Sequence, residues 1–287
     1  MKTIFVIRSD GVFVILRVNN SPKGFLKSRN HRKALEKARA ESISTEKGLP
    51  FFILDIPEHM NDSSWERIAE KCGRYASRIV APRCLSLPDC GRLKRFIPSF
   101  TPSLLVFNTA LSVLDKASID PCTVSITLTD RNALHPSRVH RLLPFSSTVR
   151  VITSHPEKYA SACKNALDEY GASLIIRSAY ESGTKRDIVI CSDGGASPMM
   201  KGAAVFTHKQ STAGRLCFCC SGVELTDAHK KILPPDIEPT DFAGAVTELC
   251  GSSEYKRAVF SNIASACNIC DDPSPDTCLR CYCEGRV

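Results

Sequence analysis

The sequence lacks the features that mark membrane and secreted proteins. No stretch approaches the roughly 18 consecutive apolar residues of a membrane-spanning helix. The amino-terminal apolar run is interrupted by Arg8 and Asp10, far short of a signal-peptide core. Internal repeats and low-complexity tracts are also missing. These absences predict a cytoplasmic globular protein without a membrane-spanning segment.

Cysteine, by contrast, is abundant. The chain has 15 cysteines in 287 residues, and without a secretion signal we expect most of them to be buried thiols in a reducing compartment. The composition, 43% hydrophobic and 24% charged, is that of an ordinary globular protein, and the length favours two lobes over one.

The positive charge is concentrated near the amino terminus. The net charge is +8, and residues 23–39 contain many lysines and arginines with Glu36 as the one acid. Such a segment could meet phosphate groups. Because no nucleic-acid-binding motif accompanies it, the favoured interpretation is a solvated helix face, and a nucleic-acid partner is not expected.

The clearest pattern lies between Thr148 and Gly195. A β-branched run at residues 149–153 is followed by Ser154, Pro156 and Glu157, which together indicate the start of a helix. Gly171 can end that helix with a positive φ. Continuous apolar runs at 173–176 and 187–191 then predict strands covered on both faces. The order strand, helix, strand, strand is typical of a parallel α/β sheet.

This pattern extends to a prediction for the whole chain. Residues 1–118 are expected to form an α/β lobe that starts with a β-hairpin at the turn Asp10-Gly11. Residues 119–235 are expected to form a doubly wound, mainly parallel, Rossmann-like lobe, with further strands at 123–128, 203–206 and 216–219. Residues 236–287 are expected to hold two helices, 240–249 and 253–266, and a cysteine-rich tail.

The carboxyl ends of parallel strands converge on one edge of a sheet, so a ligand crevice is expected there. Paired glycines in this position let backbone N–H groups approach a phosphate or another anion, although a flexible turn would look the same. The candidate contacts for a small phosphorylated or nucleotide ligand are Asp130, Asn132, Ser154, His155, Asp193, Gly194, Gly195 and Ser197.

Three residues at the same edge are candidates for proton transfer. His208 and Lys209 follow a predicted strand directly, and Asp193 follows another. Burial could bring the pKa of a histidine or lysine near neutrality, which general acid–base catalysis requires. The alternative is a solvated pair with no chemical role, and no nucleophile with its base can be assembled from spacing alone.

The second lobe resembles the nicotinamide-binding half of two-domain dehydrogenases such as shikimate dehydrogenase and methylenetetrahydrofolate dehydrogenase. The resemblance depends on residues 149–153 with their helix, on 187–195 and on 200–205. It implies a Rossmann-like fold, NAD(P) as cofactor, and Ser154 and His155 where the second strand meets the adenosine ribose. One feature departs from the pattern, because the turn Thr129–Pro136 contains no glycine to admit a pyrophosphate.

The tail contains two C-x-x-C pairs, a spacing typical of tetrahedral zinc sites. A structural zinc ion bound by four thiolates is therefore predicted, with an iron–sulfur cluster or a reduced, disordered tail as alternatives. The four predicted ligands are Cys267, Cys270, Cys278 and Cys281.

The sequence leaves three hypotheses about function. The first is a binding or regulatory protein on a degenerate dinucleotide-binding scaffold, favoured by the missing glycines. The second is an NAD(P)-dependent oxidoreductase with an atypical cofactor site. The third is a nucleic-acid or protein interaction module that uses residues 23–39 and the cysteine tail.

Overall fold

A computed structural model of the chain describes residues 13–19, 41–44, 50–57, 62–88, 92–181, 186–193, 198–209, 214–249, 258–263 and 274–286. The chain divides into two compact units, each of which is discontinuous in sequence. Unit 1 comprises residues 1–101 and 225–255, and unit 2 comprises residues 102–224 and 256–287. None of the described helices is long and apolar enough to cross a membrane.

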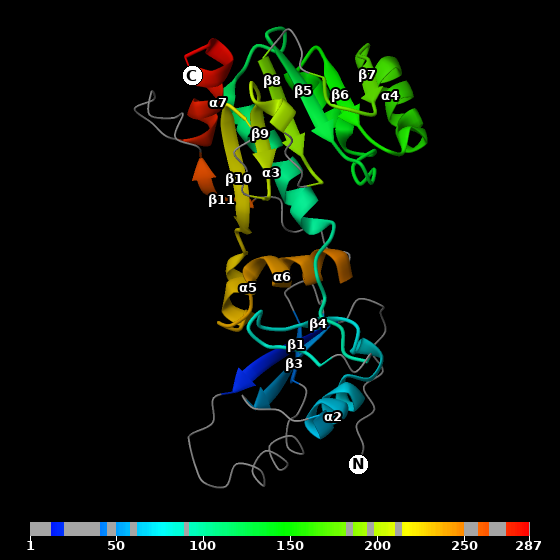
Figure 1. Ribbon diagram of the computed structural model, residues 1–287, viewed down its shortest axis with the longest axis vertical. Helices are drawn as coiled ribbons and strands as arrows, with labels where there is room; N and C mark the ends of the chain where they lie inside the picture. The colour runs from blue at the N-terminus through cyan, green and yellow to red at the C-terminus, as the bar shows by residue number, and fades with distance from the viewer. Residues whose placement is uncertain are drawn as a thin grey trace. The chain divides into compact units, whose positions relative to one another are not determined.

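Unit 1 is built on a four-stranded sheet with the order β2-β3-β1-β4 (Figure 1). Its strands are β1 (Phe13–Asn19), β2 (Glu41–Ser44), β3 (Pro50–Pro57) and β4 (Ile79–Val80). β1 runs parallel to both β3 and β4, whereas β2 is antiparallel to β3. The first strand of the predicted hairpin, at residues 2–8, and the basic segment 23–39 both lie outside the described residues.

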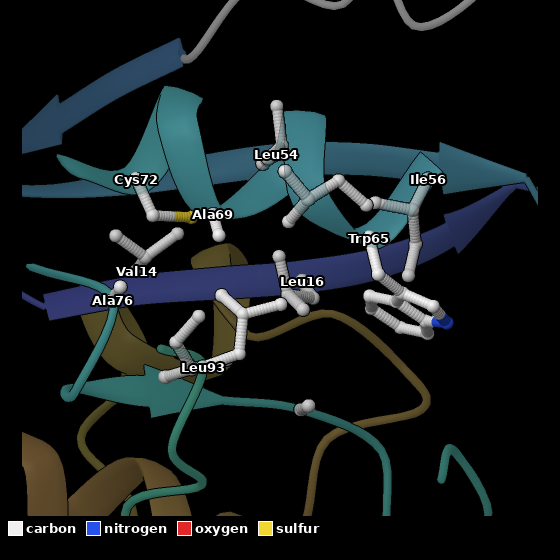
Figure 2. Close-up of a cluster of buried hydrophobic side chains, with 12 residues drawn as sticks. Val14, Leu16, Leu54, Ile56, Trp65, Ala69, Cys72, Ala76 and Leu93 are labelled. Atoms are coloured by element: carbon white, nitrogen blue, oxygen red, sulfur yellow. The ribbon is translucent and has the colours of Figure 1, made fainter. Parts of the chain in front are cut away.

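The core of unit 1 lies between this sheet and α2 (Asp62–Cys72). Figure 2 shows Trp65 beside Leu16 and Ile56, with Leu93 and Cys72 completing the cluster. Trp65 and Ile68 are three residues apart, and this helical spacing puts both on the buried face. Alternate residues of β1 and β3 supply the opposite wall, as the period of a strand requires.

The later part of unit 1 is helical, with α5 (Asp227–Ile232), α6 (Pro239–Gly244) and a π-helical turn, η5 (Ala245–Leu249). This agrees with the helix predicted at 240–249. Glu248 in η5 accepts hydrogen bonds from the backbone N–H groups of Phe100 at 2.7 Å and of Thr101 at 2.6 Å. Its other carboxylate oxygen accepts from Ser99 N at 3.1 Å. Glu248 thus caps the start of α3 (Thr101–Ala117).

Unit 2 contains a seven-stranded sheet with the order β11-β10-β9-β8-β5-β6-β7 (Figure 1). The strands are β5 (Val124–Thr129), β6 (Val149–Ile152), β7 (Leu174–Arg177), β8 (Arg186–Cys191), β9 (Ala204–Thr207), β10 (Leu216–Val223) and β11 (Ala258–Ile263). All neighbours are parallel except β10 and β11. Counted from β5 to β10, the strand order is that of a doubly wound, Rossmann-like sheet, which confirms the predicted fold class.

The central strands of this sheet, β5, β8 and β9, are covered on both faces. Every residue of β5 and β9 is buried, and so is every residue of β8 after Arg186. The crossover from β6 to β7 contains the short 3-10 helix η3 (Pro156–Tyr159) and α4 (Ala160–Tyr170). Gly171 ends α4 with φ 60°, as predicted from the sequence.

The carboxyl-terminal part differs from the prediction at two places. The helix expected at 253–266 is wrong for its central residues, because β11 forms there and pairs antiparallel with β10. The second C-x-x-C pair lies in α7 (Pro275–Glu284), which begins with Ser274 as its N-cap and Pro275 in the first turn.

The helix α7 is anchored to the amino ends of the central strands by Tyr282, which is buried. The hydroxyl of Tyr282 donates to the carbonyl oxygens of Asp187 at 3.0 Å and Gly202 at 2.8 Å. In return, the Arg186 guanidinium donates to the carbonyl oxygen of Tyr282 at 2.8 Å. Gly285 ends α7 with φ 83°, a left-handed backbone conformation that favours glycine.

Candidate functional site

The candidate site is the carboxyl edge of the unit 2 sheet, where the strand order reverses between β5 and β8. Thr129, the last residue of β5, is in register with Cys191, the last residue of β8. On the far side, Cys191 is in register with Thr207 of β9. In doubly wound sheets ligands bind outside this point of reversal, because the crossovers leave to opposite faces and open a crevice.

The turn after β5 is organised by Asp130, which is 1% exposed. Its carboxylate accepts hydrogen bonds from the backbone N–H groups of Leu134 and His135, both at 2.8 Å. A third hydrogen bond comes from the Tyr159 hydroxyl at 2.5 Å. Burial and the neighbouring carboxylate raise the pKa of Tyr159 far above its ordinary value, so the hydroxyl remains a donor. The hydrogen-bond donors of this turn are therefore occupied by the carboxylate of Asp130.

His135 fixes the same turn against α3. Its ring stacks on Phe107, with 4.9 Å between ring centroids, and its Nε2 atom lies 2.6 Å from the Ser103 hydroxyl. The side chain is fully buried, and burial lowers the pKa of His135 to about 4. Ser103 and His135 are as close as a nucleophile and its base. Both side chains are buried away from solvent, however, so we interpret their contact as structural.

Asp193, which follows β8, is held by residues at the end of β5. The Thr129 hydroxyl donates to its Oδ1 atom at 2.8 Å, and the Arg131 Nε atom lies 3.6 Å from its Oδ2 atom. The Asp193 side chain is 14% exposed and that of Arg131 76%. The ion pair is open to solvent on the arginine side, and we expect it to contribute little to stability.

His208 follows Thr207, the last residue of β9, and so lies at the same edge of the sheet as Asp193. Burial lowers the pKa of His208, Lys209 lowers it further, and Asp193 acts in the opposite direction. The Nδ1 atom of His208 is buried and has no hydrogen-bond partner within the described part of the chain. The three predicted proton-transfer residues, Asp193, His208 and Lys209, are therefore brought to one edge of the sheet. Cys191, the last residue of β8, is close in sequence to Asp193. Burial raises the pKa of its thiol to about 12, which makes the thiol a poor nucleophile.

Two arginines flank the end of β6. The backbone N–H of Thr153 donates to the carbonyl oxygen of Arg177 at 3.2 Å, and that of Ser154 donates to the carbonyl oxygen of Arg131 at 3.2 Å. These bonds place the three loops after β5, β6 and β7 side by side. The side chains of Arg131, Ser154 and Arg177 are exposed, whereas His155 is half-buried and lies 3.4 Å from Glu157.

The other predicted ligand contacts are less informative. Asn132 is exposed at the tip of the turn after β5. The predicted contacts Gly194, Gly195 and Ser197 lie outside the described residues.

Two residues that shape the site were not predicted from the sequence. Thr129 had no signal beyond being a polar residue at a strand end, and Tyr159 reads in the sequence as an ordinary apolar position of a helix.

The predicted zinc site is not supported. Cys278 and Cys281 are disulfide-bonded, and a disulfide sulfur cannot act as a thiolate ligand to zinc or to an iron–sulfur cluster. The other two predicted ligands, Cys267 and Cys270, lie outside the described residues. Within the described ranges, no group of three His, Cys, Asp or Glu side chains could hold a metal ion.

The expectation that most cysteines are buried thiols is met in part by the described residues. Nine described cysteines are free, and for some of them, such as Cys72 and Cys220, burial raises the pKa to about 11 and about 12. Five of the nine free cysteines are buried, whereas Cys278 and Cys281 of α7 are disulfide-bonded.

Comparison with known proteins identifies no family. No protein-family model matches the chain, and no curated protein matches it. Among solved structures, the chain is similar to L-tryptophan dehydrogenase from Nostoc punctiforme, with a TM-score of 0.33 and 13% identity over 85% of this chain and 75% of that chain. A TM-score this low supports no conclusion about the fold or the function of this chain. The resemblance to two-domain dehydrogenases is therefore supported at the level of the Rossmann-like strand order alone.

Proposed function

We propose that the protein is a binding or regulatory protein that holds a small phosphorylated ligand at the carboxyl edge of unit 2, without turnover. The observation that carries this proposal is the pair of backbone hydrogen bonds that places Arg131 and Arg177 on either side of the turn after β6. Both arginine side chains are exposed. We infer that the guanidinium of Arg177, together with that of Arg131, whose Nε atom lies 3.6 Å from Asp193 Oδ2, supplies a forked set of donors to a phosphate that binds at this turn.

The chemistry of the turn after β6 supports a phosphate rather than a ribose diol as the group bound there. Its first residues are Thr153, Ser154 and His155, so the ends of β6 and β7 present hydroxyl, imidazole and guanidinium donors. The nearby acid, Glu157, is directed to His155. A carboxylate at this place is what a ribose hydroxyl needs, whereas arginine accommodates a phosphate.

Three features argue against turnover by the familiar dinucleotide chemistry. The turn after β5 is closed by Asp130, Asp193 is engaged by Thr129 and Arg131, and the thiol of Cys191 is inert. A group that serves as a general base must reach the substrate proton, and an engaged carboxylate does this poorly.

The proposal predicts that AMP and inorganic phosphate bind to the wild-type protein and that Arg177→Ala weakens the binding about tenfold, the loss expected for one charge-assisted contact. Isothermal titration calorimetry measures both. The matched control is Arg215→Ala, because Arg215 is exposed and precedes the amino end of β10, at the opposite edge of the sheet. Equal affinities in Arg177→Ala and wild type, or no binding to wild type, would reject the proposal.

A second candidate function is an NAD(P)-dependent oxidoreductase with an atypical cofactor site. The strand order of unit 2 and the proximity of His208 to Asp193 favour it. In that case His208 and Asp193 would handle the proton that accompanies hydride transfer. This candidate requires saturable nicotinamide binding, and calorimetric titrations with NAD and NADP that show no heat of binding would remove it.

A further inference from the structure

The turn after β5 directs three donors at a single position. The N–H groups of Leu134 and His135 and the hydroxyl of Tyr159 all meet the carboxylate of Asp130, at 2.8, 2.8 and 2.5 Å. Two backbone N–H groups and a hydroxyl around one pair of oxygens form the kind of concavity that binds phosphate and other anions in proteins. In a doubly wound sheet, this turn is where the backbone meets the pyrophosphate of a dinucleotide.

We propose that this turn is an anion site whose permanent occupant is the Asp130 carboxylate, and that Asp130 thereby restricts unit 2 to phosphomonoesters and mononucleotides. The inference builds on the proposed function, because it specifies the ligand class for the same edge of the sheet. A dinucleotide would have to place its pyrophosphate where the donors are already engaged and where a second negative charge is repelled.

Two of the three donors belong to residues that are fixed by burial or by contacts other than those with Asp130. The His135 ring is fixed by Phe107 and by the Ser103 hydroxyl, and Tyr159 is fully buried. Ala133 has φ 51°, which sets the path of the turn between the carboxylate and its donors. Removal of the carboxylate should therefore leave the three donors aimed at an empty position, instead of letting the turn relax.

The experiment is chemical rescue of Asp130→Gly by formate, followed by thermal unfolding. Sodium formate is compared with sodium chloride at equal ionic strength, so that screening affects both alike. We expect Asp130→Gly to unfold at a lower temperature than wild type in chloride. Formate should raise its midpoint by about 3 °C or more beyond any effect on wild type, because an anion that binds only the folded state stabilises it.

Tyr159→Phe is the matched control, since it removes one hydrogen bond of the same cluster and keeps the carboxylate. It should lose stability without a specific gain from formate. If formate stabilises Asp130→Gly no more than it stabilises wild type or Tyr159→Phe, or if Asp130→Gly stays unfolded in both salts, the inference is wrong.

A second measurement on the unmodified protein tests the restriction to mononucleotides. Titrations with AMP and with NAD should give an affinity for NAD no greater than that for AMP. NAD binding more than tenfold tighter than AMP would overturn the inference while leaving the phosphate site intact. Failure of both nucleotides to bind would reject the proposed function instead, and the formate result would still decide whether the turn is an anion site.

Discussion

Replacement of Asp187 by alanine should lower the free energy of unfolding of unit 2 by about 3–5 kcal/mol, the range for breaking a buried charged network. Asp187 is 4% exposed at the amino end of β8. It accepts hydrogen bonds from the Ser125 hydroxyl and, at 3.0 Å, from the Tyr180 hydroxyl, and Arg150 Nη1 lies 3.5 Å from it. Alanine would remove the acceptor of two buried hydroxyl groups, those of Ser125 and Tyr180.

Urea unfolding followed by circular dichroism measures this loss. Asp168→Ala, on the exposed side of α4, is the control for removing a negative charge, and we expect it to change stability by less than about 0.5 kcal/mol. A loss below about 1 kcal/mol for Asp187→Ala would show that the network does not contribute as the hydrogen bonds indicate.

Acidification from pH 6.5 to 4 should destabilise unit 2 by about 3 kcal/mol through His135 alone. Burial lowers the pKa of His135 from its ordinary 6.5 to about 4. Between these values the unfolded chain binds a proton that the folded chain does not bind, so the free energy of unfolding falls as the pH falls. Above pH 6.5 the imidazole is neutral in both states and its contribution is fully present.

The contribution is isolated by comparing His135→Gln with wild type across this pH range. Glutamine cannot take up the proton but can still meet the Ser103 hydroxyl, so the stability difference between the two proteins should shrink or reverse in acid. His140→Gln is the control, since His140 is only half-buried. Parallel stability curves for His135→Gln and wild type would contradict the burial of a neutral imidazole.

The sequence predicts the part of the fold that is set by local signals. For the crossover from β6 to β8, the β-branched run at 149–153, Pro156, Gly171 and the two apolar runs predict strands and a helix that the structure contains. The expected cover on both faces holds for β8 but is wrong for β7, which is an edge strand without a buried residue. Burial on both faces of a parallel sheet removes the alternation of polar residues and makes such strands easy to find.

The errors arise where tertiary pairing or helix capping decides. The segment 258–263 has apolar spacing that suits a helix, but β10 offers it an open edge and it pairs as a strand. Ser274 and Pro275 are residues typical of a helix start. The spacing of the cysteines favoured a metal site more strongly than these two residues favoured a helix. The sequence therefore predicted metal-binding turns in place of the helix α7.

The location of the candidate site could be predicted from the sequence, but the hydrogen bonds within it could not. Strand order puts Asp130, Asp193 and His208 at one edge, and that much follows from topology. That Asp130 turns back on Leu134 and His135 depends on Ala133 at positive φ and on Tyr159, which come from parts of the chain without a recognisable motif. The absence of glycine from residues 129–136 argued against an ordinary pyrophosphate-binding turn. It did not reveal that the Asp130 carboxylate occupies the donors of that turn.

The most direct test of this account is a crystal structure of the wild-type protein grown with saturating AMP. We expect the phosphate between the side chains of Arg131 and Arg177, with the hydrogen bonds from Leu134 and His135 to Asp130 unchanged. A phosphate bound to those two N–H groups, with the Asp130 carboxylate displaced, would contradict it.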